Sequence, residues 1–307
     1  MCCLFGVLDH GRQLTARQKN RIVAALAAAS EARGTDATGV AFISEGKLCI
    51  HKEPLPGHRM KFRIPADAPV VMGHTRLATQ GDARKNRNNH PFQGRAEHEF
   101  ALAHNGVLFN DRDLRRELHL PSTKIETDSY VAVQILEQKK RLDTESLRDL
   151  AEKVRGSFVF TLLDHENTLH VIRGDNPFCL YHFPKRNLYV YASTEAILQT
   201  ALKRLKMLDG QEVPVQSGEI LQIRMDGSIQ RDYFDDMQML TGWSPYWRAH
   251  WSCDDYWTST PKQATSHLEE LKTVAIAFGY APEDVDLLAG QGFTAEEIEE
   301  FFYCGEL

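Results

Sequence analysis

The sequence begins Met1-Cys2-Cys3-Leu4-Phe5-Gly6, which places a thiol directly after the initiator methionine. Cysteine is small enough for the methionine to be removed, so we expect a mature chain that begins at Cys2. That residue then carries both a nucleophile and a base, because an α-amine has an ordinary pKa of about 8 and a thiol one of about 8.5. Such a residue can replace the pairing of a nucleophile with a histidine. Taken alone, the same pattern also fits an ordinary thiol.

Five later segments are rich in Gly, Arg, Asn, His and Asp, a composition typical of strand ends and tight turns. They are Arg33-Gly34-Thr35-Asp36-Ala37-Thr38-Gly39, Gly73-His74-Thr75-Arg76-Leu77-Ala78-Thr79-Gln80-Gly81, Asn89-His90-Pro91-Phe92, Ala103-His104-Asn105-Gly106-Val107-Leu108-Phe109-Asn110 and Glu126-Thr127-Asp128-Ser129. Together with Cys2-x-x-x-Gly6, their order and spacing resemble the class II glutamine amidotransferase domain, one of the N-terminal-nucleophile hydrolases. The resemblance covers about residues 2–235 and implies hydrolysis of the side-chain amide of glutamine.

The resemblance implies a catalytic set of three residues. Cys2 is the nucleophile and its freed amine moves the proton, while the side chain of Asn105 and the backbone N–H of Gly106 hold the oxyanion. An Asn-Gly turn suits this role because glycine has no Cβ to obstruct the reacting carbon. The dipeptide by itself is also explained by a plain hairpin turn.

Glutamine is a zwitterion at its α-carbon, so a selective site needs one cation and one anion. By resemblance, Arg76 binds the α-carboxylate, a task for which its planar fork is better suited than lysine. Asp128 receives the α-ammonium, and Thr79 also lies in the substrate pocket. Considered singly, either charged residue is more simply explained as a surface or structural ion.

Three further positions have supporting roles in the resemblance. Arg33 contacts the surroundings of the nucleophile, Asp36 braces the turn of its own segment, and His90 lies near the pocket. Two positions depart from the family pattern. Cys3 replaces the usual glycine and adds bulk and a second thiol beside the nucleophile, and Leu77 replaces a bulky aromatic residue in one wall of the pocket.

The composition excludes several classes of protein. The chain has 307 residues, of which 42% are apolar and 25% charged, as in soluble globular proteins. A net charge of −6 argues against a general nucleic-acid binder, and no run approaches the roughly 18 apolar residues of a membrane span. The cysteines form no C-x-x-C pair, so neither a zinc site nor a disulfide framework is indicated. We therefore expect a cytoplasmic protein with no metal, no cofactor and no nucleic-acid or membrane partner.

The hydrophobic pattern predicts a mixture of helices and strands. Helices are expected over residues 16–32, 127–139, about 147–154 and 194–205, strands over 157–163, 168–173, 178–183 and 188–192, and hairpins around Glu45-Gly46 and Asp226-Gly227. Periodicity alone predicts an α+β fold. The resemblance implies a four-layer αββα sandwich, in which two antiparallel sheets lie between helices.

We expect two domains, a hydrolase-like one over residues 2–237 and a Trp-rich segment with a small helical C-terminal appendage over 238–307. All four tryptophans fall between residues 243 and 257. They either anchor the tail on the main domain, which we favour, or bind a partner. Beyond residue 266, amphipathic patterns predict two helices separated by a short turn over residues 282–288.

The leading functional hypothesis is release of ammonia from glutamine through a γ-glutamyl thioester on Cys2. Two alternatives stay open, namely hydrolysis of a γ-glutamyl amide of a larger amine and a non-catalytic module that senses or regulates through glutamine. Residues 238–307 are too few for a synthase domain. The ammonia is therefore expected to leave as product or to pass to a separate acceptor or synthase protein.

Deletion of residues 238–307 should leave glutamine turnover largely intact, because this segment contains neither the nucleophile nor any glutamine-binding motif. The measurement is the rate of glutamate formation by the full-length and shortened chains, with the folding of each checked by circular dichroism. A soluble, folded fragment without turnover would show that the tail completes the active site.

Overall fold

The computed structural model describes residues 2–235 and, further along the chain, residues 271, 272, 275, 280–291, 293 and 298. The chain divides into two compact units, residues 1–239 and residues 240–307. The domain boundary expected after residue 237 remains a prediction.

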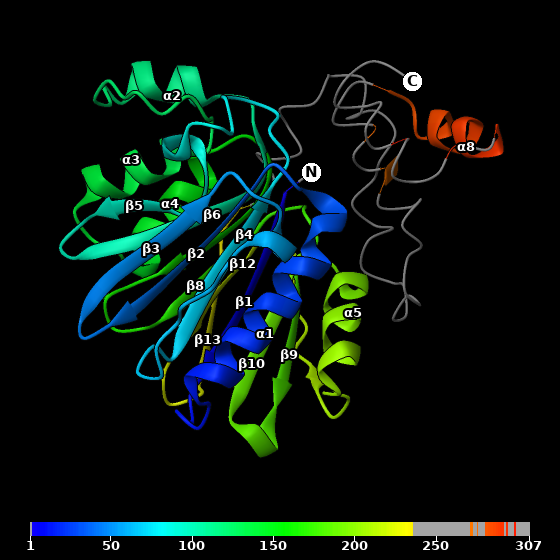
Figure 1. Cartoon of the computed structure of the whole chain (residues 1–307). Coiled ribbons are helices and arrows are strands. Elements are labelled where there is room, and N and C mark those ends of the chain that lie inside the picture. The colour runs from blue at the N-terminus through cyan, green and yellow to red at the C-terminus, as the bar shows by residue number, and fades with distance from the viewer. Residues whose placement is uncertain are drawn as a thin grey trace. The chain divides into compact units, whose positions relative to one another are not determined.

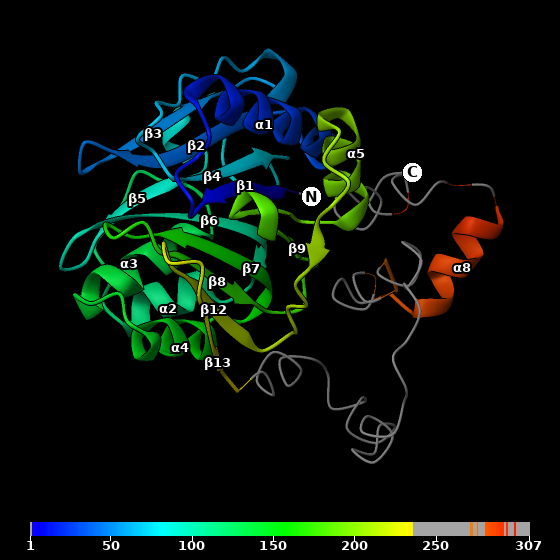
Figure 2. The ribbon, with the colours of Figure 1, turned by 90° about the horizontal axis from the view of Figure 1, so that it is seen from below.

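Two antiparallel sheets face each other in the first unit and form its inner layers (Figures 1 and 2). One sheet has seven strands in the order β11-β9-β10-β1-β4-β2-β3, and the other has six in the order β13-β12-β8-β7-β6-β5. Neighbouring strands pair antiparallel in both sheets. The strands are β1 (Cys3–Asp9), β2 (Ala37–Ser44), β3 (Lys47–Glu53), β4 (Val70–Arg76), β5 (Phe92–Arg95), β6 (Glu99–Leu108), β7 (Gly156–Leu163), β8 (Leu169–Arg173), β9 (Cys179–Phe183), β10 (Leu188–Ala192), β11 (Gln211–Glu212), β12 (Glu219–Ile223) and β13 (Ile229–Tyr233).

Helices cover the outer face of each sheet. Figure 2 shows α1 and α5 against the seven-stranded sheet and α2, α3 and α4 against the six-stranded one. These helices are α1 (Ala16–Ala29), α2 (Asp111–Glu117), α3 (Tyr130–Lys139), α4 (Thr144–Lys153) and α5 (Glu195–Leu205), and short 3-10 turns cover Ser30–Arg33, Gly57–Arg59, Asn86–Asn88 and Pro184–Arg186. The expected αββα sandwich is confirmed. Within the part of the chain that the structure describes, no helix is long and apolar enough to cross a membrane.

Strand β1 is buried on both faces, and its side chains alternate between two cores. Cys3, Phe5 and Val7 pack in the core beneath α1 and α5. Leu4 and Leu8 point the other way, into the core between the two sheets. Because side chains alternate along a strand, continuing the pattern back by one residue directs position 2 toward the space between the sheets.

Strand β6 of the opposite sheet follows the complementary pattern. Ala101 and Ala103 face the core between the sheets, whereas Phe100 and Leu102 face the core beneath α2, α3 and α4. The same alternation directs Asn105 toward the inter-sheet space. The fold therefore turns the first residue before β1 and Asn105 of β6 toward the same layer.

Within residues 2–235 the helices, strands and hairpins expected from the sequence are present, with differences at some of their ends and several elements that were not expected. The helix expected to begin at residue 127 begins at Tyr130, because the residues before it form a turn in which Asp128 accepts a hydrogen bond from the backbone N–H of Leu108. Strand β5 and helix α2 have no counterpart in the prediction. Both are short, with four and seven residues, so they give little periodic signal.

The described part of the second unit corrects one prediction. The turn expected over residues 282–288 is wrong, since helix α8 occupies Pro282–Gly290. Pro282 fits the first helical turn, and the Asp284 side chain accepts a hydrogen bond from the backbone N–H of Ala281. Val285 and Leu288, three residues apart on one face, are buried together. The tryptophans lie outside the described residues, as do most residues of the two helices predicted on either side.

The packing of Cys3 generates a stability prediction. Cys3→Gly should lower the free energy of unfolding by about 2 kcal/mol, because it empties a fully buried site and adds backbone freedom to a central strand. Cys3→Ala should cost about half as much, since it keeps the Cβ. Urea unfolding of both variants measures the difference, with Cys49→Ala of the edge strand β3 as control. Equal stability of the wild-type and Cys3→Gly chains would contradict this placement.

Candidate active site

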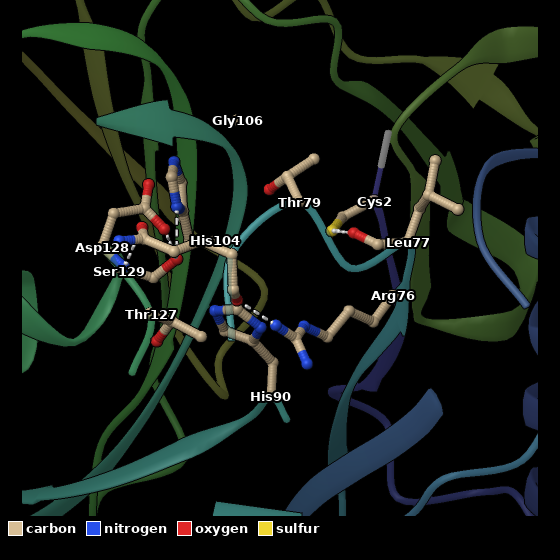
Figure 3. Close-up of a pocket in the computed structure, with 11 residues that line it drawn as sticks. Cys2, Arg76, Leu77, Thr79, His90, His104, Gly106, Thr127, Asp128 and Ser129 are labelled. Atoms are coloured by element: carbon tan, nitrogen blue, oxygen red, sulfur yellow. Dashed lines mark hydrogen bonds between the residues drawn. The ribbon is translucent and has the colours of Figure 1, made fainter. Parts of the chain in front are cut away.

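A pocket lies where strand β1 begins and strands β4 and β6 end, and residues from four of the five later motif segments and from the N-terminal segment meet there (Figure 3). Figure 3 shows Cys2, Leu77 and Arg76 on one side and Asp128 and Ser129 on the other. The pocket is lined by Cys2, Arg76, Leu77, Thr79, Gln80, His90, His104, Gly106, Thr127, Asp128 and Ser129. Segments that are far apart in the sequence therefore converge on one thiol.

Cys2 is placed by contacts to two other segments. Its Sγ donates to the carbonyl oxygen of Leu77 at 3.5 Å, and its own carbonyl oxygen accepts a hydrogen bond from Arg33 Nε at 3.2 Å. Burial raises the pKa of the Cys2 thiol, while the positive charge of Arg76 acts in the opposite direction. A neutral thiol is a weak nucleophile, so chemistry at this position requires a base within reach.

Arg76 is 3% exposed and is fixed by neighbouring polar groups. Its Nη1 donates to Asn89 Oδ1 at 2.9 Å, and its Nη2 donates to the carbonyl oxygens of Gln80 and Gly81. The turn that follows Arg76 is braced by Asp36, whose Oδ2 accepts from the backbone N–H of Ala78 at 2.7 Å. The guanidinium is thus a rigid, buried cation at the wall of the pocket.

Asp128 is the acidic residue of the pocket and is 5% exposed. Its Oδ2 accepts from the backbone N–H of Leu108 at 2.7 Å, and its Oδ1 accepts from Ser129 Oγ at 3.4 Å. The backbone N–H of Asp128 donates to Gln80 Oε1 at 3.0 Å. Gln80 therefore contacts both charged residues of the pocket, Arg76 through its carbonyl oxygen and Asp128 through its side chain.

Asn105 is fully buried and is held across the gap between the sheets. Its Nδ2 donates to Ser193 Oγ at 3.4 Å, and the same oxygen accepts from the backbone N–H of Leu4 at 2.8 Å. Ser193 follows strand β10, and through these two hydrogen bonds it links strand β1 to β6. Asn105 Oδ1 has no hydrogen-bond partner within the described part of the chain.

Gly106 meets a requirement that only glycine satisfies at this point. Its φ of +140° lies in a region that L side chains rarely adopt, and an added Cβ would lie 1.9 Å from the carbonyl oxygen of Ser157. The backbone of Gly106 therefore reaches the pocket without a side chain in the way.

Three buried histidines lie together here, and two of them, His90 and His104, line the pocket. His74 Nε2 lies 3.0 Å from the carbonyl oxygen of His104, whose Nδ1 lies 2.8 Å from Ser129 Oγ, and the rings of His74 and His90 are 4.3 Å apart. Burial lowers the pKa of all three, to about 3 for His74. The imidazoles are therefore neutral at ordinary pH. Both ring nitrogens of His90 lack a hydrogen-bond partner among the described residues.

The structure brings most of the sequence-predicted residues together. Cys2, Arg76, Thr79, His90, Gly106 and Asp128 line the pocket, Arg33 and Asp36 contact its segments, and Asn105 adjoins Gly106. The departing Cys3 points into the core beneath α1, away from the pocket, whereas Leu77 lies in the wall. Within the described residues, no group of three or more His, Cys, Asp or Glu side chains is arranged to hold a metal ion.

Sequence reasoning missed several residues of the site. Gln80, His104 and Ser129 lie inside quoted motif segments, so their position beside predicted residues was a usable signal. Ser193 gave no such signal, because it follows an ordinary apolar strand and is 88 positions from Asn105. Only the pairing of strands β1 and β10 brings it to the site.

Comparison with known proteins identifies the same family. Residues 74–200 match the family described as "Glutamine amidotransferase domain". Glutamine–fructose-6-phosphate aminotransferase (isomerizing) from Bacillus licheniformis is 34% identical over 209 residues, which is 65% of this chain and 34% of that protein. The Bacillus spizizenii protein of the same name is 32% identical over the same shares. The chain thus spans about a third of the length of these curated relatives.

Solved structures agree on the fold. The glutamine phosphoribosylpyrophosphate amidotransferase from B. subtilis superposes with a TM-score of 0.62 at 19% identity, over 76% of this chain and 49% of that one. A second structure, of an allosteric regulatory enzyme of purine biosynthesis, gives a TM-score of 0.62 at 20% identity over the same shares. These two structures therefore share the αββα sandwich of this chain. Residues 74–200 thus match a glutamine amidotransferase domain, and the chain is homologous to part of the aminotransferases named above.

Proposed function

We propose that this domain hydrolyses the side-chain amide of glutamine to glutamate and ammonia, with Cys2 as nucleophile. The observation that carries the proposal is the arrangement of charge around the thiol. A buried cation, Arg76, and a buried anion, Asp128, line one pocket with Cys2. An α-amino acid offers the matching pair of charges, and its side chain then extends toward the thiol.

The first half of the reaction forms a thioester. The free α-amine of Cys2 takes the thiol proton as sulfur attacks the amide carbon, which creates an S–C bond and a tetrahedral oxyanion. Asn105 Nδ2 and the Gly106 N–H stabilise this charge. Collapse breaks the C–N bond, and the α-ammonium returns its proton to the leaving nitrogen, which departs as ammonia. A γ-glutamyl thioester of Cys2 remains.

The second half regenerates the enzyme. A water molecule attacks the thioester carbon while the α-amine accepts its proton, and the same two donors stabilise the second oxyanion. The C–S bond then breaks, the thiolate takes the proton back, and glutamate leaves. Because burial disfavours the thiolate of Cys2, a base carried by the same residue matches the need of this site.

Arg76 and Asp128 together form a clamp on the α-carboxylate and α-ammonium of the substrate. Each of the two residues has hydrogen-bonding capacity that its contacts to described residues do not use. The hydrogen bonds that Arg76 makes to described residues use three of its five N–H donors. Two donors remain for an α-carboxylate. Asp128 accepts one hydrogen bond on each oxygen, and each carboxylate oxygen has capacity for a second from an α-ammonium.

We further propose that residues 2–237 form the catalytic domain and that residues 238–307 do no amide chemistry. The relatives named above are aminotransferases about three times as long as the matched region. We infer that ammonia from this domain either leaves as product or passes to a separate acceptor protein. A γ-glutamyl amide of a larger amine stays the alternative substrate, because one wall of the pocket is formed by Leu77, which replaces a bulky aromatic residue of the family.

The proposal predicts that Cys2→Ala abolishes glutamate formation, because no other residue combines a thiol with a free α-amine. Cys3→Gly should preserve turnover, since its side chain points away from the pocket. Glutamate is quantified by amino-acid analysis. Intact mass confirms loss of Met1 and shows whether a chloroketone analogue of glutamine adds once, at Cys2. Substantial turnover in Cys2→Ala, together with an inactive but folded Cys3→Gly chain, would show the assignment to be wrong.

The clamp predicts that Asp128→Asn and Arg76→Lys act mainly on KM. Loss of the Asp128 charge should cost about 2–5 kcal/mol of binding, and Arg76→Lys keeps the charge but loses the planar fork that pairs with a carboxylate. Both changes appear in KM if ground and transition states are held equally. Asn can still accept from the Leu108 N–H, so Asp128→Asn removes charge with little change of shape. Arg84→Ala is the control, because the Arg84 side chain is 89% exposed and lies in the segment that follows Arg76.

A second substrate sharpens this test. N-acetylglutamine has no α-ammonium, so Asp128→Asn should impair its turnover far less than that of glutamine. Equal loss with both substrates, or an unchanged KM for glutamine in both variants, is incompatible with the clamp.

A further inference from the structure

The peptide bond between Asn105 and Gly106 has a partner that none of the motifs contains. Gly106 lines the pocket, and the carbonyl oxygen at the other end of the same peptide group, that of Asn105, accepts a hydrogen bond from Asn176 Nδ2 at 3.1 Å. Asn176 is 3% exposed and follows strand β8. An added Cβ on Gly106 would lie 2.7 Å from Asn176 Nδ2, which shows how closely the side chain approaches this peptide.

The segment after β8 meets the β6–β7 pair at this peptide. In the register, Asn105 lies opposite Val159 and Gly106 lies opposite Phe158. The N–H of Phe158 donates to Asp175 Oδ1 at 3.1 Å, and its carbonyl oxygen accepts from the N–H of Gly174 at 3.0 Å. Both main-chain groups of Phe158 are directed to the segment after β8, on the side away from β6. The φ of +140° at Gly106 also departs from regular strand geometry.

We propose that Asn176 is a positioning residue that orients the Asn105–Gly106 peptide so that the Gly106 N–H faces the pocket. A trans peptide is planar and directs its C=O and N–H to opposite sides. A donor fixed on the carbonyl oxygen therefore fixes the direction of the N–H. It also polarises the amide, which strengthens the N–H as a donor. The inference rests on the proposed function, in which this N–H stabilises the oxyanion.

Asn176 is itself well anchored for this task. The neighbouring Asp175 caps the N–H of Phe158, and Pro177 restricts the backbone on the other side. The amide of Asn176 is buried, so its hydrogen bond does not compete with bulk water. Residues 175–177, which contain no catalytic motif, thus orient one oxyanion donor, the Gly106 N–H. The other donor, Asn105 Nδ2, is contacted by Ser193.

The sequence permits a direct measurement of this peptide group. Asn-Gly occurs once in the chain, at Asn105–Gly106. Protein labelled with 13C-carbonyl asparagine and 15N glycine therefore gives a single HNCO cross-peak, which reports the carbonyl and the amide of this peptide alone. Loss of the hydrogen bond from Asn176 should move both the 13C and the 15N shift.

The test compares Asn176→Ala and Asn176→Asp with the wild type. The Asp variant is isosteric but replaces the donor facing the carbonyl with an acceptor, so it should shift the cross-peak as Ala does. Each variant should lower kcat by roughly 10-fold with little change in KM, a smaller effect than the roughly 10²- to 10³-fold loss on removing a donor outright. Asn20→Ala is the matched control, because Asn20 Nδ2 also donates to backbone carbonyls, those of Ala16 and Ile64, far from the pocket.

The outcomes separate this inference from the proposed function. A folded Asn176→Asp chain that keeps the wild-type cross-peak, or that shifts it with kcat unchanged, overturns the inference. Should Asn176→Ala fail to fold, the isosteric variant decides. A wild-type chain that begins at Cys2 and lacks turnover contradicts the proposed function instead, and the cross-peak alone then decides whether Asn176 orients the peptide.

Discussion

The position of Cys2 depends on strand β1 being hydrogen bonded along both edges. β10 pairs with residues 5–9 of β1 on one side, and β4 pairs with residues 3–8 on the other. A central strand fixed in this way cannot slip by one residue without exchanging its two faces, which would move Phe5 out of one core and Leu4 out of the other. The packing of the whole sandwich therefore sets the direction of the Cys2 thiol at the start of the strand.

The charged residues of the pocket are fixed before any substrate arrives. Arg76 ends strand β4 and Asp128 lies in the turn before α3, yet Gln80 binds both of them. Their separation is therefore set by one residue rather than by two independent loops. Rigid donors and acceptors avoid the cost of ordering side chains on binding, and a fixed oxyanion site avoids reorganisation during the reaction.

Much of this site could be predicted from the sequence, because its charged and polar residues lie in short motifs whose order resembles a known family. Strand order and the facing of β1 and β6 could not be predicted in the same way, since they depend on pairings over long sequence distances. Ser193 and Asn176 illustrate the limit, because each follows an ordinary strand and reaches the site only through the sheet. The error over residues 282–288 was local instead. The segment begins with Pro282, and proline suits the first turn of a helix.

The buried histidines of the pocket are neutral, and this affects how an amino acid can bind there. A protonated His90 or His104 would place a second cation in a pocket that, as we propose, accepts an α-ammonium beside Asp128. Burial lowers the pKa of both imidazoles, so the charged form is disfavoured where the substrate binds. Arg76 is then the cation of the pocket, and the direction of the bound amino acid follows from that asymmetry. In the binding mode that we propose, the carboxylate lies at Arg76 and the ammonium at Asp128, so the side chain of the substrate is left to reach the thiol of Cys2.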